Sequence, residues 1–259
     1  MSSLVARRRH PAAIAIVLLL GLILTGGLYA AFAPKDADAA TSSTQTIAAG
    51  HKLFLSNCAS CHGVNATGTD DAPSLVGVGA AAVDFQVGTG RMPLANPGVQ
   101  AERGKVQFTG DEVSQLSAYV ASLGTGPSIP SSSLTSGGGD IAKGGELFRV
   151  NCAMCHNFAG SGGALTRGKF APNLMDVSGR HIYEAMLTGP QSMPVFNNSN
   201  LSPQDKKDII SFLQNVKTES SPGGWSMGNL GPVTEGLFAW TIGIGLLIFI
   251  AVWLGKKAA

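Results

Sequence analysis

Two long apolar runs lie near the ends of the 259-residue chain, and a stretch of mixed hydrophobic and polar residues separates them. The second run covers residues 236–254, contains no charged residue, and includes Trp240 and Trp253. Its 19 residues extend over about 28 Å as an α-helix, close to the ~30 Å hydrocarbon core of a bilayer. Tryptophan is also frequent near the membrane–water boundary. The pattern therefore predicts a transmembrane helix over 236–254.

The first apolar run, residues 11–33, allows two interpretations. A cluster of three arginines precedes it, and Ala-x-Ala sequences occur between 31 and 40, as in a cleavable signal peptide. The run is longer than the ~7–15 residues of a usual signal core. We therefore predict an uncleaved transmembrane anchor over 11–33, with the signal peptide as the alternative.

Basic residues mark the outer flanks of both runs. The tails, residues 1–10 and 255–259, contain five of the 18 Lys and Arg residues and none of the 16 acidic residues. The remaining 13 cations and 16 acids give the part between the tails a net charge of −3. Basic flanks stay on the cytoplasmic side, so we expect both termini inside the cell and the central part on the outer, periplasmic side of the cell membrane. The pI of 8.4 reflects these tails and does not indicate nucleic acid as a partner.

The central part contains an internal repeat. A shift of 94 residues aligns 47–62 with 141–156, and ten of these 16 positions are identical. Shared Ala-Pro-x-Leu, Thr-Gly and Met-Pro sequences follow in both copies. The alignment predicts two domains of about 80 residues, 47–124 (the first repeat) and 140–218 (the second repeat).

Three predicted linkers separate these parts, at 34–46, 125–139 and 219–235. The segment 125–139 is rich in Ser, Gly and Pro, a composition typical of flexible chains. We expect it to be flexible, so that docking partners and not the chain itself set the relative orientation of the two repeats.

Each repeat closes with a helical pattern. The sequences Thr109-x-x-Glu112 and Ser202-x-x-Asp205 predict capping boxes, the second with Asp in place of the usual Glu or Gln. Apolar residues then recur at helical spacing, at Val113, Leu116, Tyr119, Val120 and Leu123 in the first repeat and at Ile209, Ile210, Phe212 and Leu213 in the second. The pattern predicts a helix at the end of each repeat.

All four cysteines lie in two Cys-x-x-Cys-His motifs, one at Cys58, Cys61 and His62 and the other at Cys152, Cys155 and His156. This spacing is the attachment signature of c-type haem, in which both thiols bond to one porphyrin and the histidine binds its iron. A four-thiolate zinc site would not require the histidines or the long separation between the pairs. A thioredoxin-like motif would need a βαβ context, and disulfides this short would constrain little chain. We predict two covalently bound haem c groups.

Two of the seven methionines occupy matching positions of the repeat. Met92 and Met193 each precede a proline and are predicted to be the second axial ligands of the two irons. The alternative is that they fill gaps in the core, as most methionines do. Met175 and Met186 have no counterpart in the first repeat and are interpreted as pocket or core residues. An iron closed by His and Met has no position for a substrate and favours electron transfer.

The two repeats resemble class I cytochrome c domains. In that family a helix with Gly-x-x-x-Phe or Gly-x-x-x-Tyr precedes the haem motif and crosses a C-terminal helix that bears an aromatic residue. Gly50 and Phe54 match this pattern in the first repeat, and Gly144 and Phe148 match it in the second. Glycine also permits close approach of two helix backbones. The resemblance implies an all-α fold of two tandem domains. It also implies that the haem completes a core too small to be stable alone.

The same resemblance gives a role to Pro73 and Pro172 of the Ala-Pro-x-Leu sequences. In the family, a proline carbonyl at this place accepts a hydrogen bond from Nδ1 of the axial histidine. Such a contact fixes the imidazole orientation and raises its basicity. An ordinary turn proline is the alternative.

The layout of the whole chain resembles the dihaem cytochrome cc subunit of the actinobacterial-type cytochrome bcc complex, a menaquinol–cytochrome c reductase. The resemblance implies a cytochrome b subunit and a Rieske iron–sulfur subunit as partners, and a haem–copper terminal oxidase as electron acceptor in a supercomplex. It implies an electron-transfer subunit of a quinol–cytochrome c oxidoreductase that has no substrate-converting site of its own. A membrane-anchored cytochrome subunit of a periplasmic dehydrogenase and a dihaem peroxidase are the alternatives.

Overall fold

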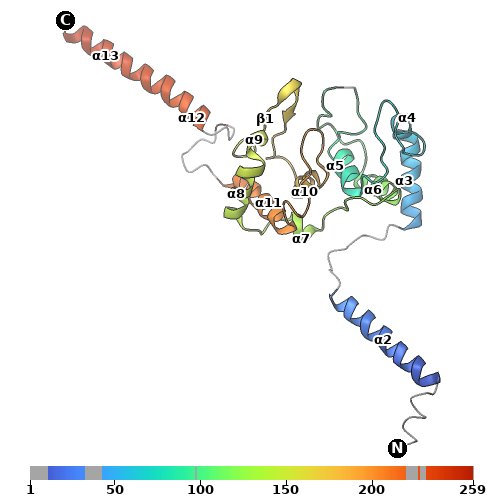
Figure 1. Cartoon of the computed structure of the whole chain (residues 1–259). Coiled ribbons are helices and arrows are strands. Elements are labelled where there is room, and N and C mark those ends of the chain that lie inside the picture. The colour runs from blue at the N-terminus through green and yellow to red at the C-terminus, as the bar shows by residue number, and fades with distance from the viewer. Residues whose placement is uncertain (1–10, 33–42, 97, 220–226, 228–231, 259) are drawn as a thin grey trace, which may run out of the picture. The chain divides into compact units, whose positions relative to one another are not determined.

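The computed structural model describes residues 11–32, 43–96, 98–219, 227 and 232–258 (Figure 1). They belong to two compact units, one within Met1–Ala40 and the other within Thr41–Ala259. The first unit contains helix α2 (Pro11–Phe32), and the second contains both repeats and the C-terminal helices. The predicted tail 1–10 and most of the predicted linkers 34–46 and 219–235 lie outside the described residues.

In the first repeat, helix α3 (Thr44–Asn57) packs against helix α6 (Gly110–Ser122). The two helices cross at Gly50, where a Cβ atom would overlap with the carbonyl oxygen of Gln115 and lie 2.9 Å from the Cβ of Tyr119. Phe54, four residues after Gly50, is 1% exposed and lies in a core with Leu116 and Tyr119. The close helix approach predicted at the glycine is confirmed.

The second repeat is built in the same way from helices α8 (Ile141–Asn151) and α11 (Pro203–Thr218). A Cβ atom on Gly144 would overlap with the carbonyl oxygen of Asp208. Phe148 is fully buried and packs on Phe212, with ring centroids 5.4 Å apart. The two repeats therefore have separate cores around equivalent helix crossings.

Both predicted capping boxes are confirmed. The amide of Glu112 donates to Thr109 Oγ1 (3.3 Å), and the amide of Thr109 donates to Glu112 Oε2 (2.8 Å). The shorter aspartate makes the same reciprocal contact, since the amide of Ser202 donates to Asp205 Oδ2 at 3.0 Å. These contacts satisfy amides that the first helical turn leaves without partners.

A further helix in each repeat was not predicted from the sequence, α5 (Ala80–Gly88) and α10 (Gly179–Thr188). Helix α5 packs against α6, α10 packs against α11, and the two also pack against each other. Five residues of α5 are buried, and they do not form a single apolar stripe. The hydrophobic periodicity that marks an amphipathic helix is therefore missing from its sequence.

The mostly helical structure agrees with the expected all-α fold class and adds one short hairpin to it. The structure is mostly helical, with the short helices α4 (Ala59–His62) and α9 (Ala153–His156), but strands β1 (Gly163–Ala164) and β2 (Phe170–Ala171) form a small antiparallel sheet. A short 3-10 turn, η1 (Thr166–Gly168), connects the two strands. The chain between the haem motif and Pro172 is longer than the corresponding chain before Pro73, and the hairpin occupies this extra length.

The segment 125–139 differs from the flexible linker that we expected. It contains a short helix, α7 (Ser132–Thr135), which packs against α10 and α11. The carbonyl of Pro127 accepts a hydrogen bond from the amide of Ala81 (3.1 Å), and the amide of Gly139 donates to Ser211 Oγ (2.8 Å). The segment is therefore bonded to both repeats.

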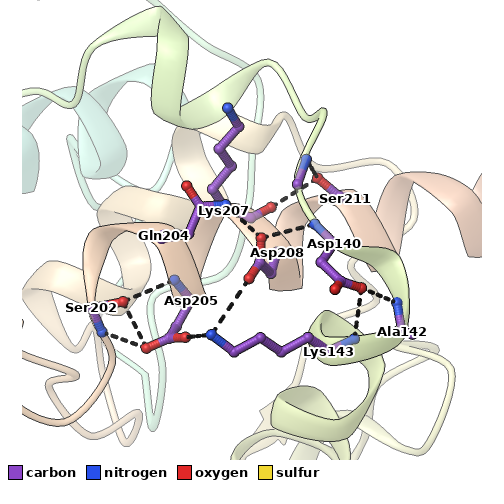
Figure 2. Close-up of polar contacts among 10 residues, drawn as sticks. Asp140, Ala142, Lys143, Ser202, Gln204, Asp205, Lys207, Asp208 and Ser211 are labelled. Carbon is purple, nitrogen blue, oxygen red and sulfur yellow. Dashed lines mark hydrogen bonds and ion pairs between the residues drawn. The ribbon is translucent and has the colours of Figure 1, made fainter.

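A polar network fixes the end of this segment to α11 (Figure 2). The buried carboxylate of Asp208 accepts from the amide of Asp140 (2.9 Å), and Asp140 caps α8. Lys143 reaches from α8 to Asp205 (2.5 Å) and lies 3.8 Å from Asp208. The hydrogen bond to Lys143 and those within the capping box lower the pKa of Asp205 to about 2. The network therefore ties the start of the second repeat to its last helix.

Charged side chains lie where α5 meets α10. Arg180 Nη2 contacts Asp84 Oδ1 at 2.5 Å, and Arg180 Nε lies 3.3 Å from Glu184 Oε1. Burial and the hydrogen bond and charge of Asp84 raise the pKa of Glu184 to about 9, so its carboxyl is protonated near neutral pH. A protonated Glu184 can donate a hydrogen bond to Asp84. This bond would satisfy two buried oxygens, Asp84 Oδ2 and Glu184 Oε2, that otherwise have no hydrogen-bond partner.

The C-terminal helix predicted over 236–254 is confirmed and is longer than predicted. Helices α12 (Pro232–Phe238), η3 (Ala239–Ile244, a π-helical turn) and α13 (Gly245–Ala258) follow one another directly. Within the described part of the chain, Val233–Lys257 is the one helix that is long and apolar enough to cross a membrane. The apolar stretch Ala12–Leu28 of α2 is helical but shorter.

Candidate haem sites

Each Cys-x-x-Cys-His motif forms a single helical turn after the helix that precedes it. Cys58 ends α3, and its carbonyl accepts from the amide of His62 (2.9 Å). Cys152 ends α8 and makes the same contact with the amide of His156 (2.9 Å). One turn thus places both thiols and the imidazole of a motif next to one another, and all four thiols are free.

The two motifs lie against different cores. Cys58 packs against the core of the first repeat, and Cys152 packs against the core of the second. Helices α4 and α9, which carry the histidines, are accordingly well separated in Figure 1. The arrangement is incompatible with a single site that uses all four thiolates, such as the zinc site considered above.

Both histidines are oriented by a proline carbonyl. His62 Nδ1 lies 2.7 Å from the carbonyl oxygen of Pro73, and His156 Nδ1 lies 3.0 Å from that of Pro172. An Nδ1–H that donates to a carbonyl leaves Nε2 as the unprotonated nitrogen, which is the one able to bind a metal. Burial lowers the pKa of His156, and the hydrogen bond to Pro172 opposes this effect in part.

The matched methionines lie against the same cores as the motifs. Met92 is half-buried against the core that also contacts Cys58, and Met193 is half-buried against the core that contacts Cys152. Met186 is 2% exposed on α10, and Met154 is 92% exposed. Met175 and Met186 thus lie in the second core, as interpreted from the sequence.

A cavity that opens to solvent is lined mainly by residues of the second repeat. Cys152, Cys155, His156 and Met193 all line it. Most of its other lining side chains are apolar, among them Phe148, Leu174 and Leu213. Two thiols, an imidazole and a thioether around one apolar space are the donor set and surroundings that a covalently bound haem requires. The residues present therefore fit the group.

The first repeat also contributes to this cavity, and this contribution was not among the predictions made from the sequence. Phe85, Thr89, Arg91, Gln100 and Arg103 line it together with the residues of the second repeat. One signal was present in the sequence: residues 93–108 separate Met92 from Thr109, whereas only 194–201 separate Met193 from Ser202. Eight of the 16 residues of the longer loop therefore have no counterpart in the second repeat.

His181 also lines the cavity, from α10. Its Nε2 lies 3.8 Å from Asp84 Oδ2, and its ring meets that of Phe85 edge-on at 6.2 Å. Burial lowers the pKa of His181, and the negative charge of Asp84 partly opposes this shift. Its nearest partner is thus the carboxylate at the junction between the repeats.

Comparison with known proteins agrees with this geometry. The cytochrome c family model matches residues 47–124, and the model of cytochrome C oxidase, cbb3-type, subunit III matches residues 139–213. The boundaries fall close to those of the two repeats. Each repeat is thus similar to a family of haem-binding cytochromes.

Similarity to several proteins extends over nearly the whole chain. The cytochrome bc1 complex cytochrome c subunit of Corynebacterium efficiens is 44% identical, covering 96% of this chain and 90% of that protein. The subunits of the same name from Mycobacterium tuberculosis and Corynebacterium diphtheriae are 44% and 43% identical. They cover 94% and 98% of this chain, and 90% and 97% of their own lengths. The chain therefore belongs to the cytochrome c subunits of the cytochrome bc1 complex, a family of electron-transfer haem proteins.

Proposed function

We propose that the chain carries two covalently bound haem c groups, one in each of two tandem class I cytochrome c domains. Cys58 and Cys61 would hold the first group, with His62 and Met92 as axial ligands of its iron. Cys152, Cys155, His156 and Met193 would hold the second in the same way, and Pro73 and Pro172 would orient the two histidines. The observation that carries the proposal is the shared surroundings of Cys152, Cys155, His156 and Met193 in one apolar cavity.

The proposed ligands define the chemistry. A haem iron held by histidine and methionine exchanges one electron and has a high potential for a c-type haem. The chain closes both axial positions with its own side chains, so the site has no place for oxygen, peroxide or another substrate. This arrangement favours an electron relay over a dihaem peroxidase, which would need a displaceable ligand.

Within the complex, we infer that the chain accepts electrons from the Rieske iron–sulfur subunit and passes them to a haem–copper terminal oxidase. Menaquinol would be the source of the electrons, and the cytochrome b subunit would be a neighbour in the membrane. The near-complete coverage of relatives named as subunits of the cytochrome bc1 complex supports this role.

We infer that the chain crosses the membrane twice and that both haem domains lie on the outer, periplasmic side. The helical course of Pro11–Phe32 supports an N-terminal anchor over 11–33, and the basic residues Lys256 and Lys257 at the end of α13 support a cytoplasmic C-terminus. Haem attachment on the outer side in cytochromes c of this kind agrees with this topology.

Purification of the chain from solubilised membranes tests the proposed role. We expect cytochrome b, a Rieske subunit and a haem–copper oxidase to copurify, and the intact mass of the chain to include two haems and the residues of the N-terminal helix. Copurification with a periplasmic dehydrogenase in place of these subunits would favour that alternative. A chain with one haem, or with none, would contradict the proposed sites.

A further inference from the structure

The cavity of the second repeat has a wall that belongs to the first repeat. The Gln100 side chain pairs with the backbone of Phe170: its Nε2 donates to the carbonyl (2.9 Å), and its Oε1 accepts from the amide (2.9 Å). The amide of Ala101 donates to Gln191 Oε1 at 3.2 Å, and Arg103 Nη1 donates to the carbonyl of Asp176 at 3.0 Å. Four hydrogen bonds therefore hold residues 100–103 against the second repeat.

Two arginines of the first repeat lie in this wall. Arg91 is held in place, because its Nη1 donates to Thr89 Oγ1 (2.6 Å) and its guanidinium lies 4.7 Å from the centre of the Phe85 ring. Arg103 is held by its contact with Asp176, on the other side of the junction. Thr89, Phe85 and both arginines line the cavity.

The charged side chains that line the cavity are positive. Its described lining includes Arg91 and Arg103, and neither an aspartate nor a glutamate. Both guanidiniums line the same cavity, and burial and then the charge of Arg103 lower the pKa of Arg91. Two like charges held beside an apolar space repel each other, and an anion between or beside them offsets this repulsion. The wall is therefore complementary to a ligand with an apolar body and negative groups on one edge.

Haem has this form, since its two propionate carboxylates project from one edge of an apolar ring. We propose that Arg91 and Arg103 of the first repeat bind the propionates of the haem attached to Cys152 and Cys155. A guanidinium binds a carboxylate through paired hydrogen bonds, which neutral donors of the second repeat cannot replace. This inference rests on the proposed haem of the second repeat and adds that the first repeat completes its site.

The proposal has a consequence for both haems. Arg91 is adjacent in sequence to Met92, the proposed ligand of the first iron. One turn of chain would thus contact the propionates of one haem and the iron of the other. The relative placement of the two haems would be set by this turn.

Substitution of the arginines tests the proposal by redox titration of the purified complex. Positive charge near a haem stabilises its reduced form, which is the more negative one. We expect Arg91→Gln and Arg103→Gln each to lower the midpoint potential of the second haem. A tenfold change in the reduction equilibrium corresponds to about 59 mV for one electron, and we expect the double variant to reach it. The lysine variants, which keep the charge, should restore most of the potential.

Three controls make the outcome decisive. Arg149→Gln removes a charge from α8 of the same repeat, outside the cavity lining, and should leave both potentials unchanged. Met193→His lowers the potential of one titration step and so identifies the second haem. Covalent haem is counted in every variant and in the unmodified chain. Fewer than two haems in the unmodified chain would contradict the proposed function and not this inference.

Two results would overturn the inference itself. In the first, Arg91→Gln and Arg103→Gln each bind two haems per chain, and their haem potentials equal those of Arg149→Gln. The second is a shift confined to the first haem, which would mean that Arg91 acts through Met92. If Arg91→Gln fails to incorporate haem, the exposed Arg103 provides the same test with little effect on folding.

Discussion

The residues that would hold the haems are those for which the chemistry leaves the least choice. Covalent attachment requires two cysteines and a histidine at fixed spacing, so Cys58, Cys61 and His62 could be identified without a structure. The carbonyl of Pro73 at 2.7 Å from His62 Nδ1 was expected from a family resemblance and is present. Arg91 and Arg103 could not be identified in this way, because binding of a carboxylate imposes no sequence spacing on the arginines.

The proposed methionine ligands can be tested one at a time. Met92→Leu or Met193→Leu keeps the volume of the side chain but removes the sulfur, so one iron of the two loses its sixth ligand. We expect the absorption band of the ferric iron–sulfur bond to fall to about half in each variant and to vanish in the double variant. Optical spectra of the oxidised protein measure it.

Met154→Leu is the matched control, because Met154 is 92% exposed and should leave the band unchanged. A band of full intensity in the Met92 or the Met193 variant would remove that methionine from the ligand set.

At the scale of helices, the crossing of α8 and α11 depends on the absence of a side chain at Gly144. A methyl group there would overlap with the carbonyl oxygen of Asp208, a backbone atom that cannot move without its helix. We expect Gly144→Ala to lower the free energy of unfolding by about 1–3 kcal/mol, the usual cost of overpacking. Thermal or denaturant unfolding of the purified chain measures the change.

Gly110→Ala is the control for this substitution. Gly110 begins α6, and a Cβ atom there would meet no neighbour within 4 Å. Alanine at that position should leave the stability unchanged or raise it, because it restricts the unfolded chain. Equal stabilities of the two variants would contradict the close approach of α8 and α11.

The contact between α5 and α10 should depend on pH through Glu184. Its pKa is raised from 4.5 to about 9, chiefly by burial and then by Asp84, so the folded chain retains a proton that the unfolded chain releases. The free energy of unfolding should therefore fall as the pH rises from about 4.5 to about 9, and then level off. Asp84, Arg180 and His181 lie beside this carboxyl, and Asp84 contacts both Arg180 and His181 directly, without Glu184.

Glu184→Gln tests this prediction, since the amide cannot ionise. We expect the variant to lose most of the decrease in melting temperature between mildly acidic and alkaline pH. An unchanged pH dependence would show that Glu184 does not carry it.

The helices differ in how well the sequence predicts them. The start of α6 could be predicted, because Thr109 and Glu112 form a capping box, and Val113, Leu116 and Val120 give its buried face. Helix α5 could not, because tertiary contacts with α6 and α10 bury it on several sides. Burial by other parts of the chain leaves no period in the local sequence.

At the scale of the whole molecule, the repeats are joined more closely than their linker suggested. The composition of 125–139 is that of a flexible chain, but its backbone bonds to Ala81 in one repeat and Ser211 in the other. Such contacts depend on residues far away in the sequence, and composition does not reveal them.

Removal of the C-terminal apolar helix tests whether residues 11–33 form the predicted N-terminal anchor. A chain that ends after Glu219 lacks Val233–Lys257, the membrane-length helix of the described residues. We expect this chain to remain in the membrane fraction, because an uncleaved helix over 11–33 would still anchor it. Fractionation of cells with an antibody to the second repeat measures its location.

In the control, the same truncated chain carries a cleavable signal sequence in place of residues 1–40. This control should be released from the membrane. Release of the first truncation, with an N-terminus that begins after residue 33, would show that the first apolar run is a signal peptide.

The loop 93–108 makes the order of the two repeats along the chain matter. The two copies share a motif, a helix crossing and a Met-Pro sequence, and on those features alone they could exchange places along the chain. The loop breaks this equivalence, because Gln100 and Arg103 reach the copy that follows and not the one that contains them. A chain with its copies transposed would keep every haem-attachment residue and still lose the wall of one cavity. The wall of this cavity thus requires that the first repeat precede the second, a requirement that haem attachment alone does not impose.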